Sequence, residues 1–339
     1  MDDGLAPAPR EHGWKRIVLA LAAFLLVPRV PALRAVTPIE HTLLLLVPAL
    51  AVCFLAGWLM GGRFALAVAW LTFAGLVVAI VAAPVRAVES SAYFDVARAW
   101  GLMAAATFGV VTLLAPARPF FYRALSAVGL AILLALVLVL LGQLPADRGH
   151  QLFADQFSAR NVASAVMLDA APRLPFPETW SDDWLEVLRV SSIVAARVYP
   201  ALLALESIAA CAIAWGLYHR LSRTRIGPPM ARLRDFRFND QMIWGLFAGV
   251  ALLLLPSLER LSTVGWNLVT FFGALYALRG LGVAAWFVSQ RGRLITGLAI
   301  LAAFLAGPLT LVSALGVGLG DTWFDWRGHG DGASRLPST

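Results

Sequence analysis

Two carboxylates stand four residues apart near the C-terminal end of the chain, in the stretch GLGDTWFDWRGHGDG that covers residues 318–332. Asp321 and Asp325 share one face if this stretch is helical, because residues i and i+4 are neighbours on a helix. Such a pair could hold Mg²⁺ or act as general acid and base. A metal site normally needs more ligands, and no third acid or histidine stands at a diagnostic spacing. Catalysis by this pair is therefore an alternative rather than the favoured interpretation.

The residues around these acids favour a membrane-interface anchor. Trp323, Phe324 and Trp326 carry large rings, and Arg327 carries a cation on a long aliphatic stem. Such rings sit at headgroup depth, and an arginine beside them extends its charge toward water. We predict that a membrane-spanning helix ends near Asp321 at the outer interface, with a packing or partner-contact motif as the alternative.

Two further charges lie deep inside apolar stretches. Glu206 stands in VYPALLALESIAACAIAW and Arg279 in FFGALYALRGLGVAAWF. A charge at the bilayer centre is costly unless it is paired or faces water, so each is a candidate for a substrate or ion pathway, or for a structural ion pair. At 1.5 Å per residue, Glu206 lies about 16 Å below a span end near Ala195, and Arg279 about 19 Å below Trp266. Because these depths are similar, we predict that the two side chains pair inside the bundle.

The composition defines the environment of these residues. The 339 residues are 60% hydrophobic and 14% charged, with a mean hydropathy of +0.77. A soluble domain is about a quarter charged, so this composition indicates a membrane protein, in which helices satisfy their own backbone groups. The net charge of +7 comes from arginines and lysines grouped in short loops rather than on one basic face. This distribution argues against nucleic-acid binding.

Motifs for nucleotide hydrolysis, metal binding and covalent catalysis do not occur in the sequence. We find no P-loop, HExxH, GxSxG or CxxC pattern. Cys53 and Cys211 stand in different apolar stretches, where free thiols behave as small hydrophobic residues. We therefore expect no cofactor and no metal, and a non-enzymatic function is favoured over an enzyme. A transporter with this sequence would use an ion gradient or a motor on another chain.

The apolar segments predict an all-α fold, a polytopic transmembrane helical bundle with eight or nine spans. The first segment either spans or is re-entrant, and the others are predicted at about 37–60, 64–85, 93–114, 125–144, 191–221, 242–258, 266–288 and 294–319. Small residues such as Gly280 and Gly318 predict close packing between helices. The predicted parts are a polar N-terminal arm (1–15), helices one to five (16–144), an acidic extracytoplasmic loop with an amphipathic helix (145–190), helices six to nine (191–321), and an interfacial anchor with a disordered tail (322–339).

Basic residues predict the orientation of the loops. The strongly basic 219–237 loop and shorter clusters, such as Arg118 with Arg123, mark the cytoplasmic side. The acidic 145–190 loop then lies outside, and nine spans place the C-terminus outside as well. We predict a multi-pass protein of the cytoplasmic (inner) membrane of a bacterium, with the lipid bilayer as its main partner.

Three stretches carry a resemblance to a known family. GPLTLVSALGVGLGDTWFDWR, the preceding NLVTFFGALYALRGLGVAAWFV and the basic RLRDFRFNDQMIWGLF resemble the YybS-like family of uncharacterised bacterial integral membrane proteins. That family is distantly similar to the substrate-binding S components of energy-coupling-factor vitamin transporters. The resemblance, clearest from about Tyr199 to Arg327, implies a helical bundle with a solute pocket open to the outside and an energising partner inside. This chain differs in having more spans than the usual six and a large acidic outer loop.

Three functions therefore remain open at this point. The first is a small-solute-binding or transport-related membrane component without its own ATPase, using Glu206 and Arg279. The second is a non-transport scaffold of the cell envelope that contacts other envelope proteins. The third is an intramembrane enzyme that uses Asp321 and Asp325. A polar site around the deep charges would favour the first, a solidly packed bundle the second, and further carboxylates or histidines converging on Asp321 the third.

Overall fold

The computed structural model describes residues 39–62, 91–141, 197–222, 225–289 and 307–327, with short pieces at 67–68, 72, 151, 194–195, 291–292, 296–298 and 301. These residues form helices joined by turns and irregular segments, which confirms the predicted all-α class for them. The N-terminal arm, the first apolar segment, nearly all of the third span and the 145–190 loop, and the tail from residue 328 on lie outside the described residues. The chain divides into two compact units, one reaching Met230 and one starting at Ala231, except that Pro200–Leu202 belong to the second.

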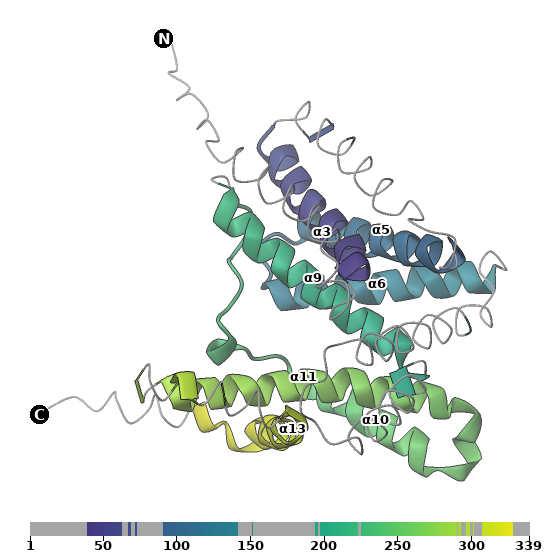
Figure 1. Cartoon of the computed structure of the whole chain (residues 1–339), viewed down its shortest axis with the longest axis vertical. Helices are drawn as coiled ribbons and strands as arrows, with labels where there is room; N and C mark the ends of the chain where they lie inside the picture. The colour runs from purple at the N-terminus through teal and green to yellow at the C-terminus, as the bar shows by residue number, and fades with distance from the viewer. Residues whose placement is uncertain are drawn as a thin grey trace, which may run out of the picture. The chain divides into compact units, whose positions relative to one another are not determined.

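The first unit is built from four described helices (Figure 1). They are α3 (Ile39–Met60), α5 (Ser91–Leu114), α6 (Phe120–Leu140) and α9 (Tyr199–Leu221). They correspond to the predicted second, fourth, fifth and sixth spans. One shifted start places Arg123 inside a helix, because α6 begins at Phe120 directly after Pro119 rather than at about Leu125.

Aromatic side chains fill the interior of the first unit. Phe54, Trp58, Phe108, Trp215 and Tyr218 are all buried in one hydrophobic cluster. The second half of α6 is instead exposed and apolar. Its residues from Ile132 to Leu140 are exposed, except that Ala135 and Val139 are partly buried. An apolar surface of this size on a helix fits contact with lipid rather than with water.

The second unit begins with an antiparallel helical hairpin. α10 (Ile243–Leu254) and α11 (Ser262–Ser289) are joined by the 3-10 helix η4 (Pro256–Leu261). The two helices pack closely, because Gly249 of α10 leaves no room for a Cβ beside Leu268 and Val269 of α11. Two short 3-10 helices, η2 (Leu233–Asp235) and η3 (Asp240–Met242), precede the hairpin.

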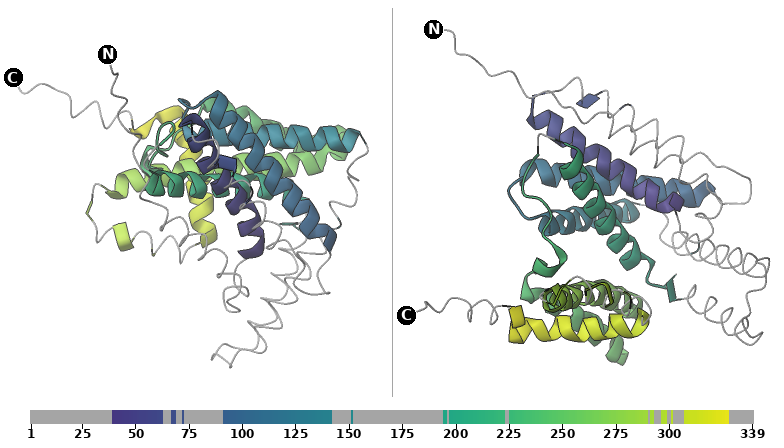
Figure 2. Two further views of the ribbon diagram at one scale, coloured as in Figure 1. Left: turned by 90° about the horizontal axis from the view of Figure 1, so that it is seen from above. Right: turned by 60° about the vertical axis from the view of Figure 1, so that its left-hand side comes forward.

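The last helix, α13 (Gly307–Phe324), crosses α11 at two glycines. A Cβ on Gly280 would collide with the carbonyl oxygen of Ala314, and a Cβ on Gly318 with that of Tyr276. Figure 1 shows α11 from the side and α13 almost along its axis, whereas the right-hand view of Figure 2 shows the reverse. The small residues at this crossing confirm the close packing predicted from the sequence.

The predicted number of spans is not confirmed. Among the described residues, four helices are long and apolar enough to cross a membrane: Val96–Leu114, α6, α9 and α11. The predicted seventh span, 242–258, is reduced to the 12 residues of α10, which extend only about 18 Å in a hydrocarbon core of about 30 Å. Within the predicted ninth span, 294–319, residues 296–298 and 301 are helical, and α13 runs from Gly307 to Phe324, while residues 302–306 lie outside the described residues.

Candidate functional site: a buried arginine and aspartate network

Arg279 is the centre of a buried charge network in the second unit. It projects from α11, and its side chain is 5% exposed. Its Nε donates to Oδ2 of Asp321 on α13 at 2.8 Å, and Nη2 donates to the backbone carbonyl of Asp321 at 3.2 Å. Nη1 donates to Oδ1 of Asp240, whose side chain is 60% exposed. Arg279 thus links a carboxylate that is fully buried to one that faces solvent.

Arg327 completes the network from beyond the end of α13. The helix ends at Phe324, and Asp325 has a φ of 37°, in the left-handed region that aspartate tolerates better than most residues. The chain turns there, so that Nη2 of Arg327 donates to Oδ2 of Asp321 at 2.7 Å. Its Nη1 donates to the backbone carbonyls of Arg234 at 3.1 Å and Phe236 at 2.9 Å. The segment before α10 is therefore bonded to the end of α13.

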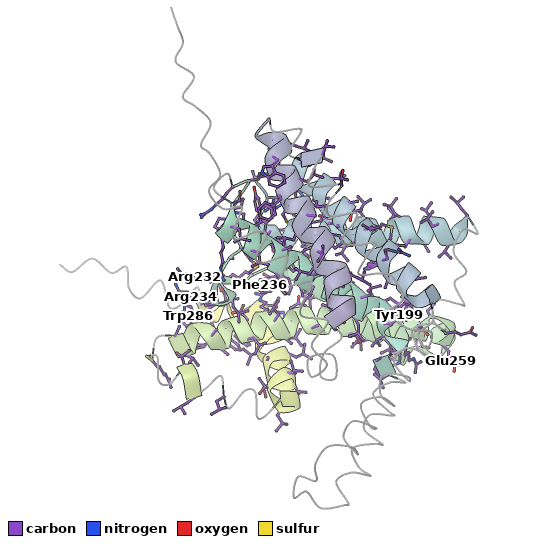
Figure 3. All side chains as sticks on the ribbon, turned by 45° about the horizontal axis from the view of Figure 1, so that its top comes forward. Tyr199, Arg232, Arg234, Phe236, Glu259 and Trp286 are labelled. Atoms are coloured by element: carbon purple, nitrogen blue, oxygen red, sulfur yellow. The ribbon has the colours of Figure 1, made fainter. Side chains whose placement is uncertain are left out.

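An exposed ion pair also joins the segment before α10 to the end of α13. Asp325 accepts from Arg237 at 2.9 Å, with both side chains about half exposed. Figure 3 shows Arg232, Arg234 and Phe236 at the end of α11 that carries Trp286, far from Glu259 at the other end of the hairpin. The basic segment and the end of α13 consequently lie on one side of the second unit.

Three buried polar atoms of this network have no hydrogen-bond partner among the described residues. They are Oδ1 of Asp321, Nε of Arg327 and the hydroxyl of Tyr276, which is near the Thr322 side chain but makes no hydrogen bond of good geometry with it. Tyr276 is connected to this network through Phe238. The Tyr276 and Phe238 rings are 5.1 Å apart, and the Arg279 guanidinium lies 5.5 Å from the centre of the Phe238 ring. Native interiors leave few buried polar groups unsatisfied, so these three atoms are candidates for contact with water or with a polar ligand.

Residues 41–321 match the family described as "Predicted membrane protein (DUF2232)". The chain belongs to this family. The match covers helices of both units and includes Glu206, Arg279 and Asp321. It establishes a membrane protein with several apolar helices, and the family description names no activity. No curated protein sequence and no solved structure is similar enough to count as a match.

The pairing predicted between Arg279 and Glu206 stays a prediction, because the two residues belong to different units. In this DUF2232 protein the hydrogen bonds of Arg279 go to Asp321 and Asp240, whereas Glu206 is an exposed residue of α9 in the first unit. The carboxylate that compensates Arg279 comes from Asp321, which the sequence analysis placed at a membrane interface.

The exposure of the C-terminal motif agrees with a membrane-interface anchor at some residues and not at others, and the anchor stays a prediction. Trp323 and Phe324 are 64% and 62% exposed, as an anchor requires, but their depth in a membrane stays a prediction. Trp326 is half-buried, with its ring stacked on Phe324 at 6.0 Å. Arg327 was expected to extend into water and is instead 3% exposed. The reason is that the left-handed turn at Asp325 directs it back onto Asp321.

Asp321 and Asp325 do not form a paired acid site. Asp321 is held by two arginines, and Asp325 by Arg237 at the surface. Within the described residues no group of three His, Cys, Asp or Glu could hold a metal ion. Sequence reasoning also missed Asp240, although its place just after the basic FRF stretch and before an apolar helix offered a signal.

Proposed function

We propose that this membrane protein binds a small polar solute or cation in its second unit and acts as a transport-related component without an ATPase of its own. The observation that supports this is the set of unpartnered buried atoms on Asp321, Arg327 and Tyr276. A buried polar group without a partner costs about 1–3 kcal/mol, and ionisable groups inside membrane helices generally serve substrate or ion pathways. A purely structural ion pair does not need these three atoms.

The charges of the network suggest how a ligand would enter. Asp321 uses Oδ2 for both arginines and keeps Oδ1 as an acceptor, while Arg279 extends from it to the exposed Asp240. A cation or a donor group can reach Oδ1 while the arginines keep their bonds. The path from solvent runs past Asp240, because this is the exposed end of the network.

The exposed arginines before α10 support a location and a partner for this component. Arg232, Arg234 and Arg237 are exposed, and such clusters remain on the cytoplasmic side. We place the protein in the cytoplasmic membrane of a bacterium, with this surface available to an energising or envelope protein. An acidic surface on that partner would complement the three exposed arginines.

Native mass spectrometry of the full-length protein in mild detergent tests the proposal. We expect a small molecule or cation to be retained by the wild type and lost in Tyr276→Phe, which removes a buried hydroxyl that has no partner and should fold normally. Asp325→Asn is the matched control, because its carboxylate is at the surface and paired elsewhere. Retention of the ligand in Tyr276→Phe and in Asp321→Asn would exclude this site.

A scaffold function is the second candidate, and the number of bonds at the junction favours it. Six hydrogen bonds from Arg279 and Arg327 fix α13 to α11 and to the segment before α10. If wild type carries no ligand and no member of a panel of vitamins, amino acids and alkali cations raises its melting temperature, the scaffold becomes the better explanation. Co-purification of an envelope protein with the exposed arginines intact, and its loss when they are replaced, would then identify the partner.

A further inference from the structure

Arg123 is a fully buried cation in the first unit, and it has no hydrogen-bond partner among the residues that the structure describes. Its side chain is 0% exposed, and Nε, Nη1 and Nη2 all lack hydrogen bonds. The guanidinium carbon lies 4.1 Å from the centre of the Trp215 ring. Arginine stays charged in proteins and carries five N–H donors, and a face-on aromatic contact satisfies none of them. A cation enclosed in this way is costly unless an anion joins it.

The position of Arg123 in α6 adds a second feature that favours anions. It lies in the first turn of a 21-residue helix that begins after Pro119 and has no side-chain cap. Helix N-termini present unpaired N–H groups and a partial positive charge, which attract anions. Helical side chains lean toward the N-terminus of their helix. The guanidinium of Arg123 follows this rule, since its Nη1 lies close to Gly227, 3.5 Å from where a Cβ would be. Gly227 in turn lies against the carbonyl oxygen of Pro116, in the loop before α6.

A short segment packs beside Arg123 and is hydrogen-bonded to side chains of α9. We call residues 226–228 the strap. The hydroxyl of Tyr218 accepts from the backbone N–H of Ile226 at 3.3 Å, and Nε1 of Trp215 donates to the carbonyl of Pro228 at 3.2 Å. Nε2 of His219 lies 3.3 Å from the carbonyl of Gly227. The strap is thus fastened by three long hydrogen bonds, with Gly227 at a positive φ of 65°.

The charged residues around the strap all have one sign. The segments 115–125 and 219–230 contain no acidic residue, and their arginines are Arg118, Arg123, Arg220, Arg223 and Arg225. Of the described ones, Arg118, Arg220 and Arg225 are exposed, whereas Arg123 is buried. Exposed arginines raise the local concentration of anions, and a buried planar guanidinium binds carboxylate or phosphate with two parallel hydrogen bonds.

We propose that Arg123, together with the N-terminus of α6, is a binding site for a carboxylate or phosphate group, with the 226–228 strap as its cover. The two sources of such a group are a free anionic solute and the headgroup of an anionic lipid. Trp215 forms one wall of the site, and the donors on the edge of the guanidinium bind the anion. This site belongs to the first unit and does not depend on the function proposed for Arg279 and Asp321.

Thermal unfolding and ligand binding by the full-length protein test this site in two arms. In nanodiscs of neutral phosphatidylcholine, inorganic phosphate and acetate are added as free anions. In the second arm no anion is added, and phosphatidylglycerol replaces part of the phosphatidylcholine, with bound lipid read by native mass spectrometry. The variants are Arg123→Gln, Arg123→Lys and Gly227→Ala, with Arg118→Gln as the matched control because Arg118 is exposed in the turn before the same helix.

We expect affinity for the bound anion to fall about tenfold or more in Arg123→Gln, which loses charged hydrogen bonds, and to be unchanged in Arg118→Gln. Arg123→Lys should retain part of the binding, since it keeps the charge and loses the planar fork. Without any anion, Arg123→Gln should unfold at a temperature equal to or above that of wild type, which shows that the variant folds. If neither arm raises the melting temperature of wild type more than that of Arg123→Gln, the proposal is overturned.

Discussion

Arg279 and Asp321 stand 42 residues apart in the chain and meet through a hydrogen bond of 2.8 Å beside the crossing of α11 and α13. The crossing glycines, Gly280 and Gly318, bring the two backbones so close that the arginine reaches both the side chain and the carbonyl of Asp321. Close helix packing and charge pairing therefore support each other. Neither feature alone explains why a cation is stable inside this apolar helix.

Replacing Asp321 by asparagine should strongly destabilise the second unit. The change keeps the size of the side chain and leaves Arg279 and Arg327 buried without their shared negative charge. Breaking a buried pair costs about 3–5 kcal/mol. The control is Asp325→Asn, whose exposed pair with Arg237 contributes about 0–1 kcal/mol. Thermal unfolding in detergent measures the stability of both variants. Equal decreases in melting temperature would show that the buried pair of Asp321 contributes no more than the exposed pair of Asp325.

A double-mutant cycle separates the observed pair from the one expected at first. We predict that Arg279→Met and Asp321→Asn are non-additive, with a coupling of about 0.5–3 kcal/mol, because the side chains are in direct contact. The cycle of Arg279→Met with Glu206→Gln should be additive, since Arg279 bonds to Asp240 and Asp321 instead. Coupling in the second cycle and none in the first would contradict this assignment. Unfolding free energies of the three single variants, the two double variants and the wild type provide the measurement.

Glycines at the helix crossing should tolerate no added methyl group. Gly280→Ala and Gly318→Ala place a Cβ against backbone carbonyl oxygens, which cannot move without separating the helices. Gly273→Ala in α11 and Gly316→Ala in α13 are matched controls, because a Cβ at either position meets nothing within 4 Å. The controls should be neutral or stabilising by about 1 kcal/mol, the helix preference of alanine over glycine. Loss of folded protein in the controls but not at the crossing would refute the packing argument.

Local patterns in the sequence were enough to predict the helices and the environment. The lengths of the apolar segments predicted the ends of α3, α5, α9 and α11 to within a few residues in most cases. The small residues at Gly280 and Gly318 correctly indicated a close crossing. These features depend on residues that are close together in the chain, so a single sequence is enough to predict them.

The partners of the buried charges could not be predicted in the same way. Arg279 was identified as a site residue, but its carboxylate, Asp321, comes from a helix whose direction depends on how 18 residues pack against α11. Arg123 was assigned to a loop because it follows Pro119, yet α6 begins before it and encloses its side chain. Both cases concern which helix covers a charge, and this is decided by tertiary packing rather than by hydropathy.

The end of α13 and the basic segment should lie on the same side of the membrane. The sequence analysis placed the 219–237 loop inside and the end near Asp321 outside, and the two positions exclude each other. Asp325 is ion-paired with Arg237, and Arg327 donates to the carbonyl of Phe236, whereas the two membrane faces are about 30 Å apart. The arginines set the side, because such clusters resist translocation. Both segments are therefore expected to be cytoplasmic.

Cysteine labelling of intact cells and of inverted vesicles measures this topology. The native thiols are unsuitable as reporters because Cys53 and Cys211 are 1% and 2% exposed, so both are first replaced by alanine. Pro229→Cys and Asp325→Cys should then react with an impermeant maleimide only in inverted vesicles. Glu259→Cys, in η4 at the opposite end of the 28-residue α11, should react only from outside the cell. Labelling of Asp325→Cys from the same side as Glu259→Cys would contradict the junction between α13 and the basic segment.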